Sequence, residues 1–536
     1  MKVLILNLTR MGDIIQTSSL INGLKKKHAN ISIDCITMSS FKSILENFPN
    51  INNIYTLDDT VLVEKKDNIL TGFLEIKNKI QKLNQQKYDI ILNLVISEQS
   101  SYLTYLLKSF DKRGMLFNKE REQKIKSDWT AYHLANEHHL GDHSLNLVDI
   151  FNGIGDVKPD FNNFFLTSSE NARDFAEKFW SENSLTDKKV IGFHIGASNS
   201  NKSWEVDKFK KVILNLIGEY KVILFGGYKE KGFEKYFEGI DSKNFINLIG
   251  QSNLDKLVAL MKKIDLLVSN DTGPMHIAAS QKTSIIDLSL GPVSHWETAP
   301  YQADNIVMQA NIECHPCKFN YACSHLSCHN YISVESVTNV IYYKLENIKL
   351  QLDKKIKYWI TKSDTFGFHH SVPFEKREIS KKEMIFEFKR AVWILTLQDK
   401  LGSSKYQFSQ YLKYLKTYYK FTFFNFSIEL NSLKKCSAYL SDYLSTVQEI
   451  LKLNLSDKQD VRELSKLWEQ SKEQLLQATS IANKTDFVTD YFSFASFKNS
   501  GIESGEIMSL AKKNYEIYCL LQDQLTILSN QLKMKN

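Results

Sequence analysis

The acidic and small residues between Ser269 and Ser280 have the clearest capacity for chemistry in this chain. The stretch reads SNDTGPMHIAAS and follows an apolar run that ends at Val268. Asp271 and Thr272 are residue types that cap helices, and proline is tolerated in a first helical turn. The pattern therefore predicts a strand, a tight glycine turn and a helix N-terminus. Free backbone N–H groups there favour an anionic ligand such as a phosphate, although an ordinary capped helix fits the same pattern.

A second acidic turn follows the first apolar run of the chain. Residues 3–8 (VLILNL) predict a buried parallel strand, and the sequence TRMGD occupies residues 9–13 directly after it. Gly12 permits a sharp turn and a close approach of the backbone to a ligand. Asp13 stands at the carboxyl end of the first strand, where open α/β sheets bind ligands. Its alternative role is that of a helix cap.

The elements that must position these turns alternate between strand and helix. Residues 1–165 carry short apolar runs separated by helical stretches, and a second set begins near Lys189, with strands predicted at 190–194, 221–225, 266–268 and 284–288. This alternation predicts an α/β fold with parallel sheets wrapped by helices. We place a first domain at 1–165, a linker at 160–187 and a second domain at 188–345.

The pattern changes beyond about residue 335. Apolar residues recur there with helical spacing over 336–357, 386–419, 430–453, 458–481 and 506–533, and Pro373 is the one proline in this part of the sequence. This spacing predicts an all-α domain over residues 346–536.

Four segments resemble glycosyltransferase family 9, the ADP-heptose:lipopolysaccharide heptosyltransferases. Two of them are RMGDIIQTSS at residues 10–19, where Ser19 replaces the usual proline, and DTGPMHIAA at residues 271–279. Between these lie HIGAS (194–198) with NKSW (201–204), and FGGYKE (225–230). The substitution at Ser19 bears on the start of the helix there and not on the chemistry. The resemblance does not cover the helical domain.

The resemblance implies the GT-B fold, in which two Rossmann-like domains face each other across a cleft. It also implies transfer of a heptose from ADP-heptose to an acceptor hydroxyl, with inversion and without a catalytic metal. Asp13 would accept the proton of the hydroxyl, which is a poor nucleophile. Lys202 and the helix N-terminus at 271–273 would stabilise the charge that develops on the leaving ADP.

The same resemblance assigns the remaining contacts. Ser198 would contact the phosphate, Glu230 the ribose hydroxyls and His276 the phosphate or the sugar, although each could be a capping or surface residue. Arg10 would bind an anionic group of the acceptor or pair with a nearby carboxylate. The full donor-binding set is Gly12, Ser198, Glu230, Asp271, Thr272, Gly273 and His276.

Four of the seven cysteines lie within fifteen residues, at Cys314, Cys317, Cys323 and Cys328. Many family members carry a similar segment after the second nucleotide-binding loop. Thiolates at this spacing in a cytosolic protein suggest a closed structural Zn or Fe site, with reduced thiols and disulfides as the alternatives. A closed site of four protein ligands leaves no position for catalysis, so we expect no catalytic cofactor.

The net charge of +7 arises entirely in the last third of the chain, where residues 351–536 contain 28 Lys and Arg against 21 Asp and Glu. Aromatic residues are interleaved with these lysines at Tyr406, Phe408, Tyr411, Tyr414, Tyr418, Tyr419, Phe421, Phe423 and Phe424. This pattern suits an anionic membrane surface, and it also suits a helical core with lysines on its solvated face. Nothing resembles a nucleic-acid-binding module.

The sequence leaves the acceptor open. A lipopolysaccharide core or related glycan is the first candidate, a protein such as a flagellin or an autotransporter recognised by the helical domain is the second, and a non-catalytic scaffold is the third. No apolar run of eighteen residues exists, and the N-terminus opens into a strand without a signal-peptide pattern. We therefore expect a cytoplasmic enzyme, with peripheral contact to the inner membrane and homo-oligomerisation as further expectations.

Overall fold

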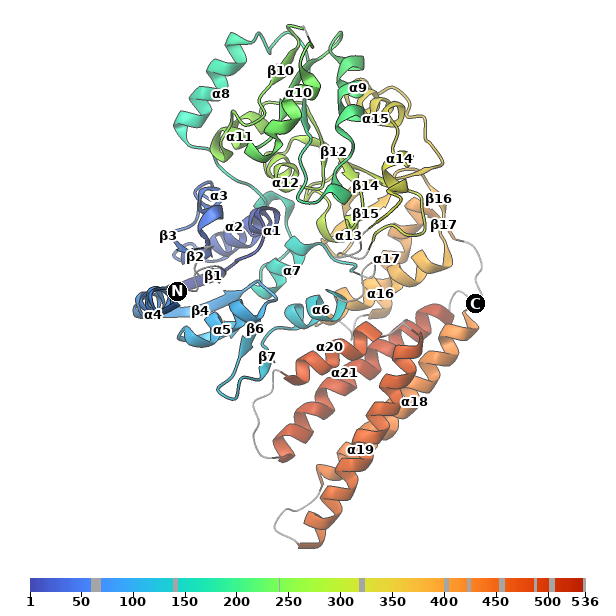
Figure 1. Ribbon diagram of the computed structural model, residues 1–536. Coiled ribbons are helices and arrows are strands. Elements are labelled where there is room, and N and C mark those ends of the chain that lie inside the picture. Colours follow the sequence, from blue (N-terminus) through green and yellow to red (C-terminus); the bar gives the residue numbers. More distant parts are fainter. Residues whose placement is uncertain are drawn as a thin grey trace. The chain divides into compact units, whose positions relative to one another are not determined.

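The computed structural model describes residues 1–58, 69–137, 143–240, 242–317, 323–399, 404–421, 426–452, 458–485, 489–500 and 507–533. These residues form two compact units. The first, which we call the sheet unit, contains residues 1–92, 108–110 and 145–376; the second, the helical unit, contains residues 93–107, 111–144 and 377–536. Figure 1 shows the elements of both units along the chain.

The first sheet has the strand order β3-β2-β1-β4-β5. Its strands are β1 (Lys2–Leu6), β2 (Ser32–Met38), β3 (Asn53–Leu57), β4 (Tyr88–Asn93) and β5 (Ser109–Arg113), and β1 runs parallel to β2 as β2 does to β3. The side chains of residues 3–6 are buried, as their continuous apolar pattern predicts. Helices α1 (Met11–Gln16) and α2 (Ser18–Lys27) follow β1. The order of the strands reverses beside β1, which is where open α/β sheets bind ligands.

The second sheet repeats this arrangement and extends it. Its order is β10-β9-β8-β11-β12-β13-β14-β15, and the first six of these strands are parallel. The parallel strands are β8 (Val190–His194), β9 (Lys221–Phe225), β10 (Phe245–Asn247), β11 (Leu266–Asn270), β12 (Ser284–Ser289) and β13 (Ile306–Ala310). The order 3-2-1-4-5-6 within this sheet is that of a Rossmann fold, so the sequence prediction of two such sheets is confirmed.

The prediction of a helix over 336–357 is confirmed as far as residue 346 and is wrong beyond it. Helix α15 spans Val334–Glu346 and ends at Asn347, which adopts the left-handed conformation with a φ of 55°. The chain then forms β14 (Ile356–Ser363) and β15 (His369–Pro373), which add two antiparallel strands to the second sheet. The second sheet therefore continues past residue 345, where we expected its domain to end. A short apolar run with mixed spacing fits a helix and a strand equally well, which explains the error.

The middle of the expected linker is a folded helix. Helix α8 (Glu170–Glu182) occupies the middle of 160–187 and packs on α11 (Leu254–Met261). The Asp255 carboxylate accepts hydrogen bonds from the Ser169 N–H at 2.9 Å and from the Ser169 hydroxyl at 2.6 Å. These bonds attach the start of α8 to the second sheet domain.

The helical unit confirms the predicted helical region and adds to it. It contains α16 (Lys381–Leu397), α17 (Ser404–Tyr418), α18 (Ser427–Ile450), α19 (Lys458–Thr485), α20 (Thr489–Ser500) and α21 (Ile507–Lys533). Residues 386–419, predicted as one helix, thus fall into α16 and α17, and α20 was not predicted. The unit also contains α5 (Glu98–Leu106), the hairpin β6 (Met115–Phe117) with β7 (Gln123–Ile125), and α6 (Asp128–Glu137).

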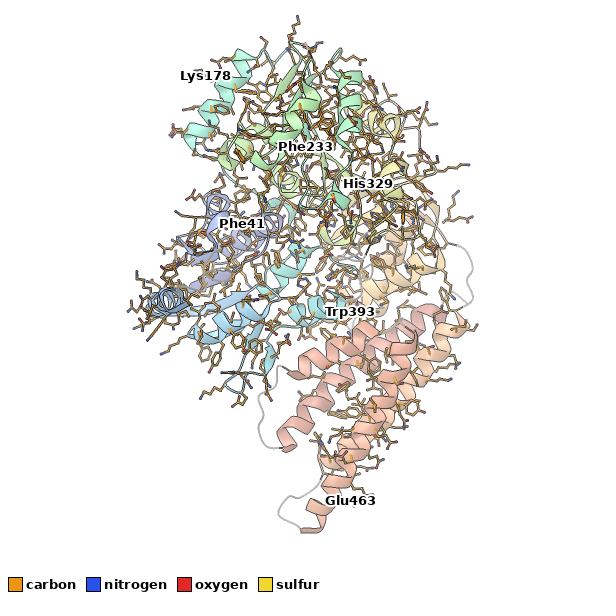
Figure 2. The ribbon with its side chains drawn as sticks, viewed as in Figure 1. Phe41, Lys178, Phe233, His329, Trp393 and Glu463 are labelled. Atoms are coloured by element: carbon orange, nitrogen blue, oxygen red, sulfur yellow. The ribbon has the colours of Figure 1, made fainter. Side chains whose placement is uncertain are left out.

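Buried aromatic and polar contacts of Trp393, which Figure 2 labels, hold the helical unit together. The Trp393 ring stacks on Tyr491 with centroids 4.4 Å apart, and it meets the Tyr132 ring from α6 edge-on with centroids 5.1 Å apart. The Trp393 indole donates to the Asp490 carboxylate at 2.9 Å, and the Lys389 ammonium pairs with the same carboxylate at 2.9 Å. A segment of the first sequence domain is therefore part of the core of the helical unit.

The aromatic pattern of the basic region is largely explained by this core. Phe408, Tyr411 and Tyr419 are buried, whereas Tyr406 is 67% exposed. Phe423 and Phe424 lie outside the described residues. Burial of these rings favours the core interpretation over a continuous aromatic surface. Among the residues described, no helix is long and apolar enough to cross a membrane.

Candidate functional site

The backbone of Asp13 is held at the carboxyl end of β1 by side chains on either side of it. The Asp13 carbonyl oxygen accepts hydrogen bonds from the Asn7 side-chain amide and from the Thr17 hydroxyl, both at 3.1 Å. The same amide group donates to the Thr17 hydroxyl at 2.9 Å. These bonds take the place of helical hydrogen bonds where α1 gives way to α2, so the orientation of Asp13 depends on residues that are close in sequence.

The electrostatic surroundings of Asp13 make it a stronger base than an ordinary aspartate. Burial of the carboxyl raises its pKa to about 6, and the Glu297 carboxylate acts in the same direction, while the charge on Arg10 opposes both. A pKa near the working pH suits a general base, because it combines an ionised form with useful basicity. Arg10 is exposed, and its positive charge lowers the pKa of Asp13. Of its two expected roles, this interaction agrees with pairing to a nearby carboxylate.

The second acidic turn lies directly opposite α1. Strand β11 leads through Asp271 into α12 (Gly273–Ser280), whose N-cap is Thr272 and whose first turn contains proline. A Cβ atom on Gly273 would lie 2.2 Å from Cε of Met11, so a larger residue here would require the Met11 side chain to move, and glycine allows α12 to approach α1 closely. The predicted strand, glycine turn and helix N-terminus are confirmed.

The hydroxyl of Thr272 does not cap the helix that it precedes. It lies 3.3 Å from Nδ1 of His194, at the end of β8, and makes no side-chain cap bond to α12. The Asp271 carboxylate instead accepts a hydrogen bond from the Thr298 hydroxyl, which belongs to the short helix α13 (His295–Thr298). The first N–H groups of α12 are therefore without a Thr272 side-chain partner, as an anion-binding helix N-terminus requires.

Lys202 is positioned by the tryptophan that follows it. Trp204 is fully buried; its N–H donates to Oδ1 of Asn270 at 3.0 Å, and its indole donates to the Ile332 carbonyl at 3.0 Å. Asn270 is the last residue of β11, so the turn η3 (Ser200–Lys202) is tied to the strand that carries Asp271. The positive charge of Lys202 lowers the pKa of His276, which shows that the two side chains are electrostatic neighbours.

Two further carboxyl groups surround Lys202, and sequence reasoning did not identify them. Burial and the neighbouring Asp271 carboxylate raise the pKa of Glu297 to about 7 and that of Asp287 well above its usual value, while Lys202 opposes both shifts. Both carboxylate oxygens of Asp287 lack a hydrogen-bond partner within the described ranges. Asp287 lies within β12 and Glu297 in α13, and neither position carries a motif that marks it in the sequence.

The other predicted donor-binding residues occupy the neighbouring strand ends. Ser198 is exposed in the loop after β8. The Glu230 carboxylate accepts a hydrogen bond from the Gly227 N–H at 2.7 Å, and a Cβ atom on Gly196 would lie 2.8 Å from its Oε1. Glu230 is thus folded against the loop that carries Ser198, and it caps its own turn. Gly12 lies under the ring of His276, where a Cβ atom would be 3.3 Å from Cδ2.

Gln16 was also missed, and it makes the most direct side-chain contact between the two predicted motifs. Its amide nitrogen lies 3.2 Å from Nε2 of His276. Both side chains are buried. The structure thus brings Gly12 and Asp13 together with Asp271, Thr272, Gly273, His276 and Lys202, from segments that are more than 180 residues apart in sequence.

The four clustered cysteines lie close enough together to influence one another. Burial raises the pKa of the Cys317 thiol to about 11, and the Cys328, Cys314 and Cys323 thiols add to the shift. The Leu326 N–H donates to Sγ of Cys323 at 3.3 Å, a contact that would also stabilise a metal-bound thiolate. Their chemistry suits a structural metal ion, but among the described residues no three of these sulfur atoms lie within 4.8 Å of one another, so the four thiols are not gathered around one point.

The cysteine segment also supports the loop that carries Lys202. The Cys317 N–H donates to the Gly291 carbonyl at 3.1 Å, and Nε2 of His329 lies 3.0 Å from the Asn201 carbonyl (Figure 2 labels His329). A Cβ atom on Gly291 would lie 2.5 Å from the same Asn201 oxygen. The residue next to Lys202 is therefore enclosed between Gly291 and α14 (Ser327–Tyr331).

Comparison with known proteins identifies the family of this arrangement. Residues 76–328 match the model of glycosyltransferase family 9 (heptosyltransferase). This matched region is a glycosyltransferase family 9 domain, and it makes the protein a glycosyltransferase. The matched range includes Lys202 and Asp271, begins after Asp13 and ends before the C-terminal helices.

Individual family members are similar to just over half of this chain. Lipopolysaccharide heptosyltransferase 1 of Campylobacter coli is 28% identical over 297 residues, which are 52% of this chain and 80% of that protein. Lipopolysaccharide heptosyltransferase 3 of Escherichia coli (strain K12) is 27% identical over 304 residues, 55% of this chain and 84% of that protein. The solved glycosyltransferase family 9 protein of Veillonella parvula DSM 2008 is 24% identical, with a TM-score of 0.51 over 65% of this chain and 97% of that one. This likeness confirms the GT-B fold.

Proposed function

We propose that this glycosyltransferase moves a heptose from ADP-heptose to a hydroxyl of a lipopolysaccharide core or a related glycan, with inversion and without a catalytic metal. The observation that carries the proposal is the placement of Asp13, with a pKa of about 6, on the helix that packs against the Asp271–Gly273 turn. The similar proteins of Campylobacter coli and Escherichia coli, both named lipopolysaccharide heptosyltransferases, support the transfer of a heptose and a lipopolysaccharide acceptor.

In the proposed reaction, Asp13 accepts the proton of the acceptor hydroxyl as its oxygen attacks the anomeric carbon. The bond from that carbon to the diphosphate breaks on the opposite face, so the configuration inverts. The carboxylate of Asp13 is ionised above its pKa of about 6 and is the stronger base for that shift. Arg10, exposed beside it, would bind an anionic group of the acceptor when it is not paired with Asp13.

The leaving ADP gains negative charge, which fixed donors in the second sheet domain would stabilise. Lys202 supplies the positive charge, and the backbone N–H groups at the start of α12 supply hydrogen bonds. Ser198 would contact a phosphate and Glu230 a ribose hydroxyl, from the loops after β8 and β9. Because Lys202 can supply the stabilisation that a divalent cation would otherwise give, the proposal includes no metal in catalysis.

We assign a structural Zn or Fe ion to Cys314, Cys317, Cys323 and Cys328. A metal held there would cross-link the segment that encloses Asn201, beside Lys202, and would take no part in bond breaking. Elemental analysis of protein purified without oxygen would identify the ion. A protein without stoichiometric metal would remove this assignment.

A protein acceptor is the second candidate, and one observation favours it. The helical unit joins residues 93–107 and 111–144, from the sequence domain that carries Asp13, to the C-terminal helices in one compact body. Such a body could recognise a protein as readily as a glycan. A scaffold without activity is disfavoured, because Asp13, Lys202 and the Asp271–Gly273 turn are all present and brought together.

A nucleotide-release assay tests the proposal. Purified protein would be given ADP-heptose, other ADP-sugars and UDP-sugars, each with lipopolysaccharide-core acceptors or with a candidate acceptor protein, and with or without EDTA. We expect ADP release that depends on ADP-heptose and on the glycan acceptor and that persists in EDTA, and NMR of the product should show inversion. Release restricted to UDP-sugars, or loss of activity in EDTA that magnesium restores, would contradict the proposal.

A further inference from the structure

Gln16 and His276 form a buried contact between α1 and α12 that the proposed reaction does not require. The Gln16 amide nitrogen lies 3.2 Å from Nε2 of His276, and the two side chains are only 1% and 2% exposed. Gln16 is the last residue of α1 and stands three positions after Asp13. The contact therefore joins the helix of the proposed base to the helix of the proposed diphosphate site.

The direction of this hydrogen bond determines where His276 carries its proton. The amide nitrogen of Gln16 faces the ring while its Oε1 is buried without a partner among the described residues, and in this orientation the amide can only donate, so Nε2 of the ring accepts and is unprotonated. Burial lowers the pKa of His276 to about 4, and the ring is neutral at physiological pH. The single proton of the neutral ring must then reside on Nδ1.

The Nδ1 edge of the ring is the one left for a ligand. Nε2 is enclosed by α1, where a Cβ atom on Gly12 would lie 3.6 Å from it. Nδ1 is buried and has no hydrogen-bond partner in the part of the chain that the structure describes. The charged groups that act on the ring are Asp271, at the turn before α12, and Lys202. A buried donor without a partner beside an ammonium group is suited to an anionic oxygen.

We propose that Gln16 is a positioning residue that fixes His276 as the Nδ1–H tautomer, ready to donate to an anionic oxygen of the donor diphosphate. The identity of the ligand rests on the proposed function, whereas the tautomer rests on the contact between the two side chains alone. Without Gln16, the ring could protonate Nε2 and present a lone pair to the ligand. A lone pair at Nδ1 would repel the same oxygen that Nδ1–H attracts.

NMR of the free protein labelled with ¹⁵N-histidine tests the tautomer without any substrate. The signals of His276 are identified by their absence from a His276→Asn variant. We expect an unprotonated Nε2 and a protonated Nδ1 in the wild type, and the reverse in Gln16→Glu, whose carboxylate would accept a hydrogen bond from Nε2–H. A protonated Nε2 in the wild type would overturn the proposal.

Binding of ADP, measured by calorimetry, tests the consequence. Gln16→Glu should weaken ADP binding by about 10-fold to 100-fold, the value of a charge-assisted hydrogen bond, whereas the uncharged Gln16→Met should cost several-fold less. The carboxylate also adds a negative charge, so the same substitution is repeated in the His276→Asn background as part of a double-mutant cycle. In the His276→Asn background, Gln16→Glu should weaken ADP binding much less.

Equal losses in the two backgrounds would show that charge alone acts, and would overturn the positioning role. Thermal unfolding of each variant separates these effects from loss of fold. If wild-type protein binds no ADP, the proposed function fails, and the NMR result still decides the tautomer. The two proposals can therefore fail separately.

Discussion

At the scale of single residues, the reactivity of the site depends on the charges around Asp13. Its pKa of about 6 predicts that kcat/KM falls as the pH drops below that value, because the protonated carboxyl cannot accept a proton. Glu297 contributes to this pKa through its negative charge. Glu297→Gln should therefore lower the pKa of Asp13 and move the acidic limb of the pH–rate profile to lower pH. An acidic limb that does not move would show that Glu297 has no influence on the base.

Asp287 provides a residue-scale test of stability. Burial raises its pKa in the folded protein well above the unfolded value, so the folded state keeps a proton that the unfolded state releases. The resulting stabilisation is complete below the unfolded pKa and is lost as the pH rises toward the folded one. Asp287→Asn removes this dependence.

We expect Asp287→Asn to raise the melting temperature by about 2 °C or more above neutral pH, and to give a smaller gain in mild acid. Thermal unfolding at several pH values measures the difference. Because Asp287 lies beside Lys202 and not at the proposed reacting atoms, kcat should change little. A gain that is the same at every pH, or a loss of stability above neutral pH, would contradict the assigned protonation.

At the scale of elements, the cysteine segment supports the loop that carries Lys202. Replacing Cys314 and Cys317 together with serine should release a bound metal, lower the melting temperature and raise the KM for the donor several-fold, because Asn201 loses its enclosure. The kcat of the folded fraction should be largely retained, since neither cysteine contacts a reacting group. Cys519→Ser, which lies in α21, is the matched control. A donor KM that stays unchanged after metal loss would show that the cysteine segment does not support the Lys202 loop.

The elements that could be predicted from sequence are those with an unambiguous local pattern. Residues 190–193 (VIGF) and 222–225 (VILF) are short runs without polar residues, and both lie in the predicted strands. Residues 356–373 could not be assigned, because their strands depend on pairing with β13 and their short apolar runs also fit a helix. Pattern alone cannot reveal such non-local pairing.

The residues of the candidate site also fall into two groups, those that could be predicted from the sequence and those that could not. The turns at Asp13 and Asp271 carry glycine and capping residues that are visible in the sequence, so their local structure could be predicted. Gln16 and Asp287 gave no signal, since glutamine at a helix end and aspartate in a strand become informative only when their buried partners are known. Their environments depend on contacts between segments that are distant in sequence.

At the scale of the whole molecule, the two compact units do not follow the order of the chain. A cut after Lys376 keeps β15 and the whole of the second sheet but removes α16–α21. It also leaves residues 111–144 without the partners of Tyr132 and Ser144, among them Trp393 and Arg390. The C-terminal helices are therefore a folding requirement for part of the first sequence domain.

We expect protein truncated after Lys376 to bind ADP with an affinity within about threefold of the full chain, because the donor residues belong to the sheet unit. Use of the acceptor should be severely reduced, and residues 111–144 should become sensitive to protease. Trp393→Ala in the full chain is the matched control, since it disturbs the core of the helical unit without removing it. Unchanged acceptor kinetics in the truncated protein would show that the helices serve folding or assembly alone.

The central claim is that Asp13 is the base of an ADP-heptose-dependent transfer, and one comparison tests it most directly. Single-turnover transfer from ADP-heptose to a lipopolysaccharide-core acceptor is measured for the wild type and for Asp13→Asn, with ADP affinity measured alongside. We predict that the variant loses about 10²–10⁴-fold in turnover, the usual contribution of a positioned base, while it binds ADP normally. Turnover of Asp13→Asn close to that of the wild type would contradict the account.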